Sequence, residues 1–457
     1  MKRKLIEQLE NWCDSLQKKP LILSGAKGTG KTYLALAFAN TFYDSYVYWN
    51  FENDPVNMED FLQAGKADLA AFFTCILTNG KSEVPLDNNV TAGSQVFVLD
   101  EITCLQGFET LIGLLKEQFP AADILAISSS EPVFSETEAK AYHLLRLYPM
   151  DFEEFLIATG NEWYIEVIKE QYRSGNSIPE IVHKELLELL EDYLYVGGLP
   201  LAVNEYVTNG CRENIPELHK NILFSYLFDA GMKKGDSCAL KVKQILYSLP
   251  EQLSKRNKKF QYALLRKGAT EALYLEGHSY IRKTSIGIYN RKITDKEIEG
   301  RRKDTADGQK NPGTKIYLFD VGLYHSLSRL AGTRNEKEFR EGLLEAYTAQ
   351  ALNTAGIDFG YWESDSMSHS LFLLKSRQGF KLHLPDTNSA VSHFDQSILP
   401  LEVRETGGNR SKGLSSFHEK HPAIQGAVKI TSGNKAVNKS KGDNLYLPLY
   451  SIFCLGL

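Results

Sequence analysis

The sequence predicts an α/β fold that begins with a parallel β-sheet covered by helices. Short apolar runs at 21–23, 46–51, 95–99 and 124–128 have the length of buried strands, and helical stretches such as 33–42 separate them. Strands and helices that alternate in this way are typical of a parallel sheet. After about residue 150 long helical periodicity takes over, for example at 181–193. A helix at 336–355 and strands at 360–363, 370–374 and 399–403 then predict a second α/β domain.

Length and composition indicate a globular protein of several domains. The 457 residues suffice for two to four domains, and a hydrophobic fraction of 43 % allows more than one core. The net charge of −5 gives no overall basic field for nucleic acid. The six cysteines include no C-x-x-C pair, which argues against zinc and for a reducing compartment. Since no secretory signal and no long apolar run are present, we expect a cytoplasmic protein without membrane contact.

A glycine-rich turn at 25–32 reads GAKGTGKT and fits the pattern G-x-x-x-x-G-K-[ST] in full. It follows a predicted strand and precedes a predicted helix, which is the context of a phosphate-binding P-loop. Backbone N–H groups of such a loop bind phosphates, Lys31 reaches the β- and γ-phosphates, and Thr32 offers its hydroxyl to Mg²⁺. The predicted ATP-binding residues are Gly25, Ala26, Lys27, Gly28, Thr29, Gly30, Lys31, Thr32 and Tyr33.

Two carboxylates end the predicted strand VFVLDE at 96–101. We expect Asp100 to hold Mg²⁺ and Glu101 to act as general base on the attacking water. An acidic turn after a core strand is the simpler interpretation of this segment alone, but the P-loop upstream favours the catalytic one. Ser128, at the end of a later strand, is a candidate contact for the γ-phosphate or the water. Arg146 is a candidate arginine finger, with a surface ion pair as its alternative.

Several longer phrases place these motifs in a recognisable context: YWNFE at 48–52, RLYPMDFEEFL at 146–156, YLYVGGLPLAV at 193–203, KIYLFDVGL at 315–323 and LPLEVRETGG at 399–408. With the P-loop they resemble bacterial and archaeal AAA-type ATPases that carry a C-terminal domain of unknown function. The resemblance implies an AAA-like ATPase domain with a helical lid over 1–210. It also implies a winged-helix-like segment over 211–330 and a restriction-endonuclease-like domain over 331–457.

The nuclease chemistry implied by that resemblance is incomplete here. Such enzymes need a carboxylate cluster for a metal and a lysine beside it. The chain supplies Glu345 and Glu402, but Leu371 stands at the position of a metal-binding aspartate, His369 at that of another acid, and Arg404 at that of the lysine. We therefore predict a degenerate nuclease fold in which Glu402 and Arg404 form a structural ion pair.

Basic residues gather at 253–303, in two clusters with interleaved aromatic residues. The clusters contain Lys255, Arg256, Lys258, Lys259, Arg266 and Lys267, then Arg282, Lys283, Arg291, Lys292, Arg301, Arg302 and Lys303. Phosphate contacts from such residues would bind DNA, whereas a solvated charged face is the competing interpretation.

Two functions stay open from the sequence. The first is an Mg²⁺-dependent ATPase whose hydrolysis moves C-terminal DNA- or protein-binding domains. The second is a nucleotide-gated regulatory module with little turnover. Glu101 favours the first, since a switch needs no placed base. The lack of an assignable arginine finger favours the second, or a homo-oligomer that supplies the arginine from a neighbour.

Overall fold

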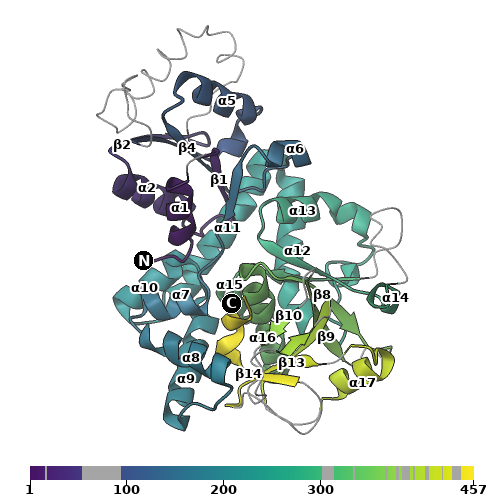
Figure 1. Cartoon of the computed structure of the whole chain (residues 1–457). Coiled ribbons are helices and arrows are strands. Elements are labelled where there is room, and N and C mark those ends of the chain that lie inside the picture. Colours follow the sequence, from purple (N-terminus) through teal and green to yellow (C-terminus); the bar gives the residue numbers. More distant parts are fainter. Residues whose placement is uncertain are drawn as a thin grey trace. The chain divides into compact units, whose positions relative to one another are not determined.

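The structure is a computed structural model of the chain, shown in Figure 1. It describes residues 1–15, 18–53, 94–300, 313–332, 335–365, 369–376, 380–382, 392–394, 397–406, 411–424, 426–434 and 444–456. The described chain divides into two compact units. Unit 1 contains Met1–Tyr148 with Lys283–Ser285, and unit 2 contains Pro149–Arg282 with Ile286–Leu457.

Unit 1 alternates helices and strands along the chain. Its elements are α1 (Ile6–Cys13), β1 (Leu21–Ser24), α2 (Lys31–Phe42), β2 (Ser45–Asn50), β3 (Gln95–Asp100), the short 3₁₀ turn η1 (Ile102–Cys104), α5 (Phe108–Gln118), β4 (Asp123–Ser128), α6 (Glu136–Ala139) and β5 (His143–Arg146). The four strands predicted from apolar runs are confirmed, each within a residue or two of its expected ends.

The five strands of unit 1 form one sheet in the order β2-β3-β4-β1-β5, and every neighbouring pair is parallel. The predicted parallel sheet is therefore confirmed. Parallel strands bring their carboxyl ends to a single edge of the sheet. That edge receives the turn after β1, the carboxylates after β3 and the serines after β4.

Each face of this sheet has its own apolar core. On one face, α1 and α2 pack through Trp12 and Phe38 against strand residues such as Val98. On the other face, α5 packs through Leu111 against Phe97. Because successive strand residues point to opposite faces, the neighbours Phe97 and Val98 enter different cores.

Unit 2 starts as a group of helices and ends in a mixed sheet (Figure 1). Its helices are α7 (Phe152–Ala158), α8 (Trp163–Ser174), α9 (Glu180–Val196), α10 (Pro200–Asn209), α11 (Ile215–Lys234), α12 (Asp236–Ser254), α13 (Glu271–Lys283), α14 (Asp295–Ile298), α15 (Val321–Leu330), α16 (Glu336–Thr354) and α17 (Lys412–Lys420), with 3₁₀ segments η2 (Tyr262–Leu264) and η3 (Leu449–Gly456). Its strands are β6 (Gly287–Arg291), β7 (Thr314–Leu318), β8 (Asp358–Glu363), β9 (Ser370–Lys375), β10 (Phe380–Leu382), β11 (Ser392–Phe394), β12 (Ile398–Val403), β13 (Ala427–Thr431) and β14 (Asn444–Pro448).

The main sheet of unit 2 has the order β14-β13-β12-β9-β8. Strands β12, β13 and β14 are parallel to one another, while β9 is antiparallel to both β12 and β8. Strands β6 and β7 form a separate antiparallel pair. The second α/β region predicted from the sequence is confirmed as this mixed sheet.

Two of the phrases that carried the resemblance meet inside unit 2. The buried carboxylate of Asp320 accepts hydrogen bonds from the backbone N–H of Gly198 at 2.7 Å and of Leu323 at 3.0 Å. The carbonyl of Gly198 in turn accepts from the N–H of Met150 at 2.7 Å. A Cβ on Gly198 would collide with the Met150 backbone, so this crossing requires glycine. Asp320 thus joins the turn between α9 and α10 to the start of α15.

This division of the chain places the helices of 149–210 in unit 2. The three-domain scheme of 1–210, 211–330 and 331–457 stays a prediction, as do its lid, winged-helix and nuclease-like parts. In the described part of the chain, no helix has the length and apolar character needed to cross a membrane.

Candidate functional site

The P-loop joins β1 to α2 and has the backbone that its sequence predicts. Gly25, Gly28 and Gly30 all have positive φ angles, of 151°, 89° and 89°. A Cβ on Gly25 would collide with the carbonyl oxygen of Leu147, so the loop lies directly against the segment after β5. Gly30 precedes the first residue of α2, which aims the N–H groups of that helix end toward the loop.

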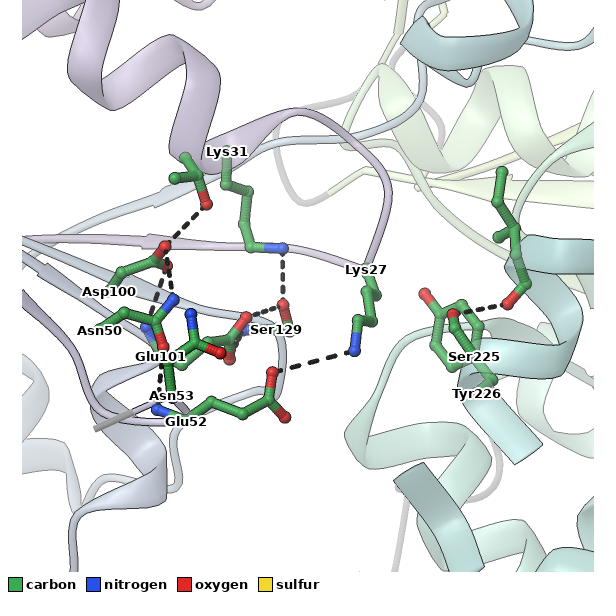
Figure 2. Close-up of polar contacts among 12 residues, drawn as sticks. Lys27, Lys31, Asn50, Glu52, Asn53, Asp100, Glu101, Ser129, Ser225 and Tyr226 are labelled. Carbon is green, nitrogen blue, oxygen red and sulfur yellow. Dashed lines mark hydrogen bonds and ion pairs between the residues drawn. The ribbon is translucent and has the colours of Figure 1, made fainter. Parts of the chain in front are cut away.

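Lys31 is the first residue of α2, and its side chain is buried at 5 % exposure. Its Nζ donates to the carbonyl of Ala26 at 3.0 Å. It also donates to the Ser129 hydroxyl at 2.9 Å (Figure 2). Burial lowers the pKa of Lys31 to about 8, and Glu101 and Asp100 oppose that shift. The Lys31 ammonium group is therefore held against the P-loop backbone, with Glu101 and Asp100 as nearby negative charges.

The Asp100 carboxylate, at the end of β3, accepts hydrogen bonds from several polar side chains. Its Oδ2 accepts from the Thr32 hydroxyl at 2.9 Å, the Tyr48 hydroxyl at 2.9 Å and the Asn50 amide at 3.2 Å. Thr32 and Asp100, the two residues predicted to bind metal, are therefore in direct contact. Their hydroxyl and carboxylate oxygens are hard ligands of the kind that Mg²⁺ prefers.

Glu101 follows in a left-handed conformation, with φ of 51°. Non-glycine residues adopt that region rarely, and they do so often at functional sites. Its carboxylate accepts a hydrogen bond from the backbone N–H of Ser129 at 3.1 Å and another from the Ser129 hydroxyl. The predicted base is therefore connected to the P-loop lysine through a single serine (Figure 2).

The structure brings Ser129, rather than the predicted Ser128, to Lys31 and Glu101. The Ser128 hydroxyl is fully buried, contacts the Thr103 hydroxyl at 2.8 Å and donates to the carbonyl of Ser130 at 2.5 Å. Strand periodicity gives the reason, since adjacent residues at a strand end point in opposite directions. The catalytic role predicted for Ser128 is not tested by these contacts.

Arg3 is a residue of this site that the sequence did not indicate. It is buried at 7 % exposure and donates to the carbonyl of Thr29 at 2.8 Å and to the carbonyl of Tyr148 at 2.6 Å. One guanidinium thus joins the middle of the P-loop to Tyr148, where the chain first leaves unit 1. The lone arginine near the N-terminus carried no motif, and its partners are 26 and 145 residues away.

The other predicted P-loop residues differ in exposure. Ala26 and Thr29 are buried, and the Thr29 hydroxyl donates to the Ala26 carbonyl at 2.9 Å. Lys27 lies 3.8 Å from Glu52 in an ion pair, and Tyr33 is 69 % exposed. Arg146 pairs with Glu131 at 2.5 Å, which is the alternative stated for it.

The second candidate centre in the sequence was the nuclease-like region of unit 2. Arg404 Nε donates to Glu402 Oε1 at 3.0 Å, so the predicted ion pair is confirmed. Glu345 is bound instead by lysines, as described below. Leu371 is buried in an apolar core, and the backbone N–H of His369 donates to the Ser364 hydroxyl at 3.2 Å. Among the described residues, no group of three or more His, Cys, Asp or Glu side chains could hold a metal ion.

Many residues of the predicted basic clusters are paired with acids. The pairs are Lys255–Glu251 at 3.1 Å, Lys258–Glu345 at 2.6 Å, Lys259–Glu363 at 2.9 Å, Arg291–Glu297 at 2.6 Å and Lys292–Glu363 at 3.3 Å. Arg282 lies over the Tyr289 ring, 4.1 Å from its centroid. Arg301, Arg302 and Lys303 lie outside the described residues.

Family models match two segments of the chain. Residues 17–156 match an AAA domain, and residues 187–334 match a domain of unknown function (DUF8612). The resemblance to AAA-type P-loop ATPases with a following domain of unknown function is therefore confirmed. The match to the domain of unknown function covers the middle of the chain, and these two matches leave residues 335–457 uncovered. No curated protein sequence matches the chain.

Solved structures give distant similarities. A Walker-type ATPase of Pyrococcus abyssi is 15 % identical, over 71 % of this chain and 93 % of its own, with a TM-score of 0.39. RuvB of Thermotoga maritima is 16 % identical, over 66 % and 93 %, with a TM-score of 0.27. Drosophila ORC bound to DNA is 12 % identical, over 72 % and 95 %, with a TM-score of 0.25. We draw no conclusion from TM-scores this low.

Proposed function

Because residues 17–156 form an AAA-type P-loop domain, we propose that this protein is an Mg²⁺-dependent ATPase. The observation that carries the proposal is the contact of the Thr32 hydroxyl with the Asp100 carboxylate at 2.9 Å, beside Lys31 and Glu101. A nucleotide-binding loop, a pair of hard oxygen ligands and a general base are thereby gathered at one sheet edge. These are the parts that phosphoryl transfer to water requires.

Thr32 and Asp100 would hold the metal ion, which supplies positive charge to the β- and γ-phosphates when bound. The P-loop N–H groups and the Lys31 ammonium stabilise the negative charge that develops on the phosphates. Because Lys31 is buried and its two hydrogen-bond acceptors among the described residues are neutral oxygens, a γ-phosphate is a stronger partner for it than the Ser129 hydroxyl.

Glu101 accepts the proton of the attacking water in this proposal. Both of its carboxylate oxygens accept hydrogen bonds from Ser129, which hold the proposed base in place. A γ-phosphate that drew Lys31 from Ser129 would leave the Ser129 hydroxyl to orient Glu101 alone. Hydrolysis would thereby depend on a filled P-loop.

Contacts within unit 1 support coupling between the nucleotide and the rest of the chain. Gly25 lies against Leu147, and Arg3 joins Thr29 to Tyr148. Tyr148 is the residue at which the chain leaves unit 1. A P-loop that shifts with nucleotide would therefore move the segment that enters unit 2. We propose that DNA or a protein partner receives this motion, that the protein acts in the cytoplasm, and that a homo-oligomer supplies the arginine finger.

The alternative is a nucleotide-gated module with little turnover. The engagement of Arg146 with Glu131 favours it, since this candidate finger is occupied within its own unit. ATP binding and phosphate release by the full chain, with Mg²⁺ or EDTA and with or without DNA, distinguish the two functions. An ATPase releases phosphate only with Mg²⁺, and Lys31→Ala abolishes the release. Tight ATP binding with no phosphate release under any of these conditions would leave only the gated module.

A further inference from the structure

Unit 2 contains a buried carboxylate that is shared by two lysines. Glu345 of α16 accepts from Lys315 Nζ through Oε1 and from Lys258 Nζ through Oε2, both at 2.6 Å. Lys315 is almost fully buried, and its Nζ also donates to the Ser370 hydroxyl at 2.9 Å. These two lysines strongly lower the pKa of Glu345, which therefore stays ionised. Two positive charges and one negative charge leave a net charge of about +1 on this group.

A second carboxylate nearby is also shared by two lysines, so it too has an excess of positive charge around it. Oε2 of Glu363 lies 2.9 Å from Lys259 Nζ and 3.3 Å from Lys292 Nζ. The Glu363 side chain is 3 % exposed, whereas Lys259 and Lys292 are 22 % and 24 % exposed. This group also carries a net charge of about +1, and solvent reaches it from the lysine side.

Tyr361 of β8 lies near both groups. Lys315 Nζ lies 4.8 Å from its ring centroid. At the other end of the ring, a Cβ placed on Gly313 would lie 3.1 Å from the Tyr361 hydroxyl and 3.2 Å from Lys259 Cε. This hydroxyl is buried and has no hydrogen-bond partner among the described residues. A buried hydroxyl without a partner costs free energy unless a ligand or water satisfies it.

We propose that Lys259, Lys292 and Tyr361, supported by Lys258 and Lys315, bind a phosphate group. Four lysines and two carboxylates leave about two uncompensated positive charges in a largely buried cluster, which is costly without an anion. A phosphate group supplies up to two negative charges and several acceptor oxygens. The partly exposed lysines give it access, and the Tyr361 hydroxyl offers a donor that has no partner among the described residues.

Chemistry favours phosphate over a divalent metal here. Both carboxylates are already neutralised by ammonium groups, and lysine offers donors rather than metal ligands. Three of these lysines belong to the basic clusters at 253–303, whose phosphate contacts the sequence left open. The phosphate group can be free or part of a nucleic acid backbone, and one experiment separates these sources. The site is independent of the P-loop and of ATP hydrolysis.

The test uses the full chain with Lys31→Ala, which removes phosphate binding by the P-loop. Calorimetric titration with inorganic phosphate then compares this protein with versions that also carry Tyr361→Phe or Lys259→Gln. Lys255→Gln is the matched control, since Lys255 pairs with Glu251 alone at 3.1 Å. A thermal melt of each protein checks folding, and Tyr361→Phe should melt like its parent because its hydroxyl bonds to no described residue.

We expect Tyr361→Phe and Lys259→Gln each to weaken phosphate binding about tenfold, and Lys255→Gln to leave it unchanged. A single-stranded DNA oligonucleotide that displaces phosphate from this site identifies a nucleic acid backbone as the source, and failure to displace identifies a free phosphate group. Absence of phosphate binding at millimolar concentration, or equal affinity in the three variants, would overturn the proposal.

Discussion

Lys31 Nζ donates a hydrogen bond to the Ser129 hydroxyl at 2.9 Å, and this hydroxyl in turn donates to the Glu101 carboxylate. One serine thus lies between Lys31, the residue proposed to bind the γ-phosphate, and Glu101, the proposed base. A phosphate that draws Lys31 away from Ser129 would change the hydrogen-bond partners of Ser129. We infer that this exchange of partners makes the position of the Glu101 carboxylate depend on whether nucleotide occupies the P-loop.

Ser129→Ala tests that exchange. Loss of the hydroxyl leaves Glu101 with only the backbone N–H of residue 129, so the carboxylate is positioned less well for water. We expect kcat for ATP hydrolysis to fall about tenfold or more, with a smaller change in KM. Steady-state phosphate release measures both constants. Ser128→Ala should have the smaller effect on kcat, and the reverse order would support the sequence-based choice of Ser128.

The lowered pKa of Lys31 predicts a pH dependence of ATP affinity. With a pKa of about 8, the free protein loses the ammonium charge as pH rises above 8, and ATP binding must restore it. We expect the Kd for ATP to rise toward tenfold per pH unit above 8, as measured by titration calorimetry. Lys31→Arg should show no such rise, because arginine keeps its proton. A wild-type Kd that is flat from pH 7 to 10 would contradict this assignment.

The same lowered pKa should make the stability of the folded protein rise with pH, whereas the affinity for ATP falls. Between pH 8 and 10.5 the unfolded chain holds a proton on Lys31 that the folded protein has lost, so this residue makes stability rise with pH in that range.

Arg3 is expected to fix the shape of the P-loop. Arg3→Met keeps much of the side-chain volume but removes the hydrogen bonds to Thr29 and Tyr148. A less ordered loop loses more conformational entropy when it binds ATP, so we expect the affinity for ATP to fall about tenfold. Fluorescence titration with an ATP analogue measures it. Lys2→Met, on the exposed neighbour, is the matched control, and equal affinities of the two variants would exclude the proposed role of Arg3.

Asp320 predicts a pH dependence of unfolding in unit 2. Burial raises its pKa to about 6 from an ordinary value of 3.8. Between these values the folded protein holds a proton that the unfolded chain has lost, so its contribution to stability falls by about 3 kcal/mol as pH rises from about 3 to about 7. Denaturant unfolding at several pH values measures this slope. Asp320→Asn should be less stable overall yet lack the slope, and parallel curves for both proteins would contradict the raised pKa.

The sheet edge that carries the site was predictable from the sequence. Four apolar runs of strand length and the pattern at 25–32 depend only on neighbouring residues, and the parallel order then brings Asp100 to Thr32. The sequence could not show which residue of the serine run faces Lys31. A shift of one residue along a strand reverses the direction of the side chain.

Contacts between segments far apart in the chain could not be predicted from the sequence. Arg3 reaches Tyr148 across 145 residues, and no local pattern distinguishes it from the lysines beside it. The ion pairs of Lys258 and Lys259 could not be predicted for the same reason. Their partners Glu345 and Glu363 lie on elements much further along the sequence. Their charge was visible in the sequence, whereas their pairing depends on the fold.

Phosphate release by Glu101→Gln tests the central claim most directly. Glutamine keeps the size and an acceptor oxygen but cannot take a proton from water. We predict that this variant binds ATP within about threefold of wild type and releases phosphate at least about 100-fold more slowly. Phosphate release by Glu101→Gln at the wild-type rate would contradict the role of Glu101 and the hydrolytic mechanism built on it.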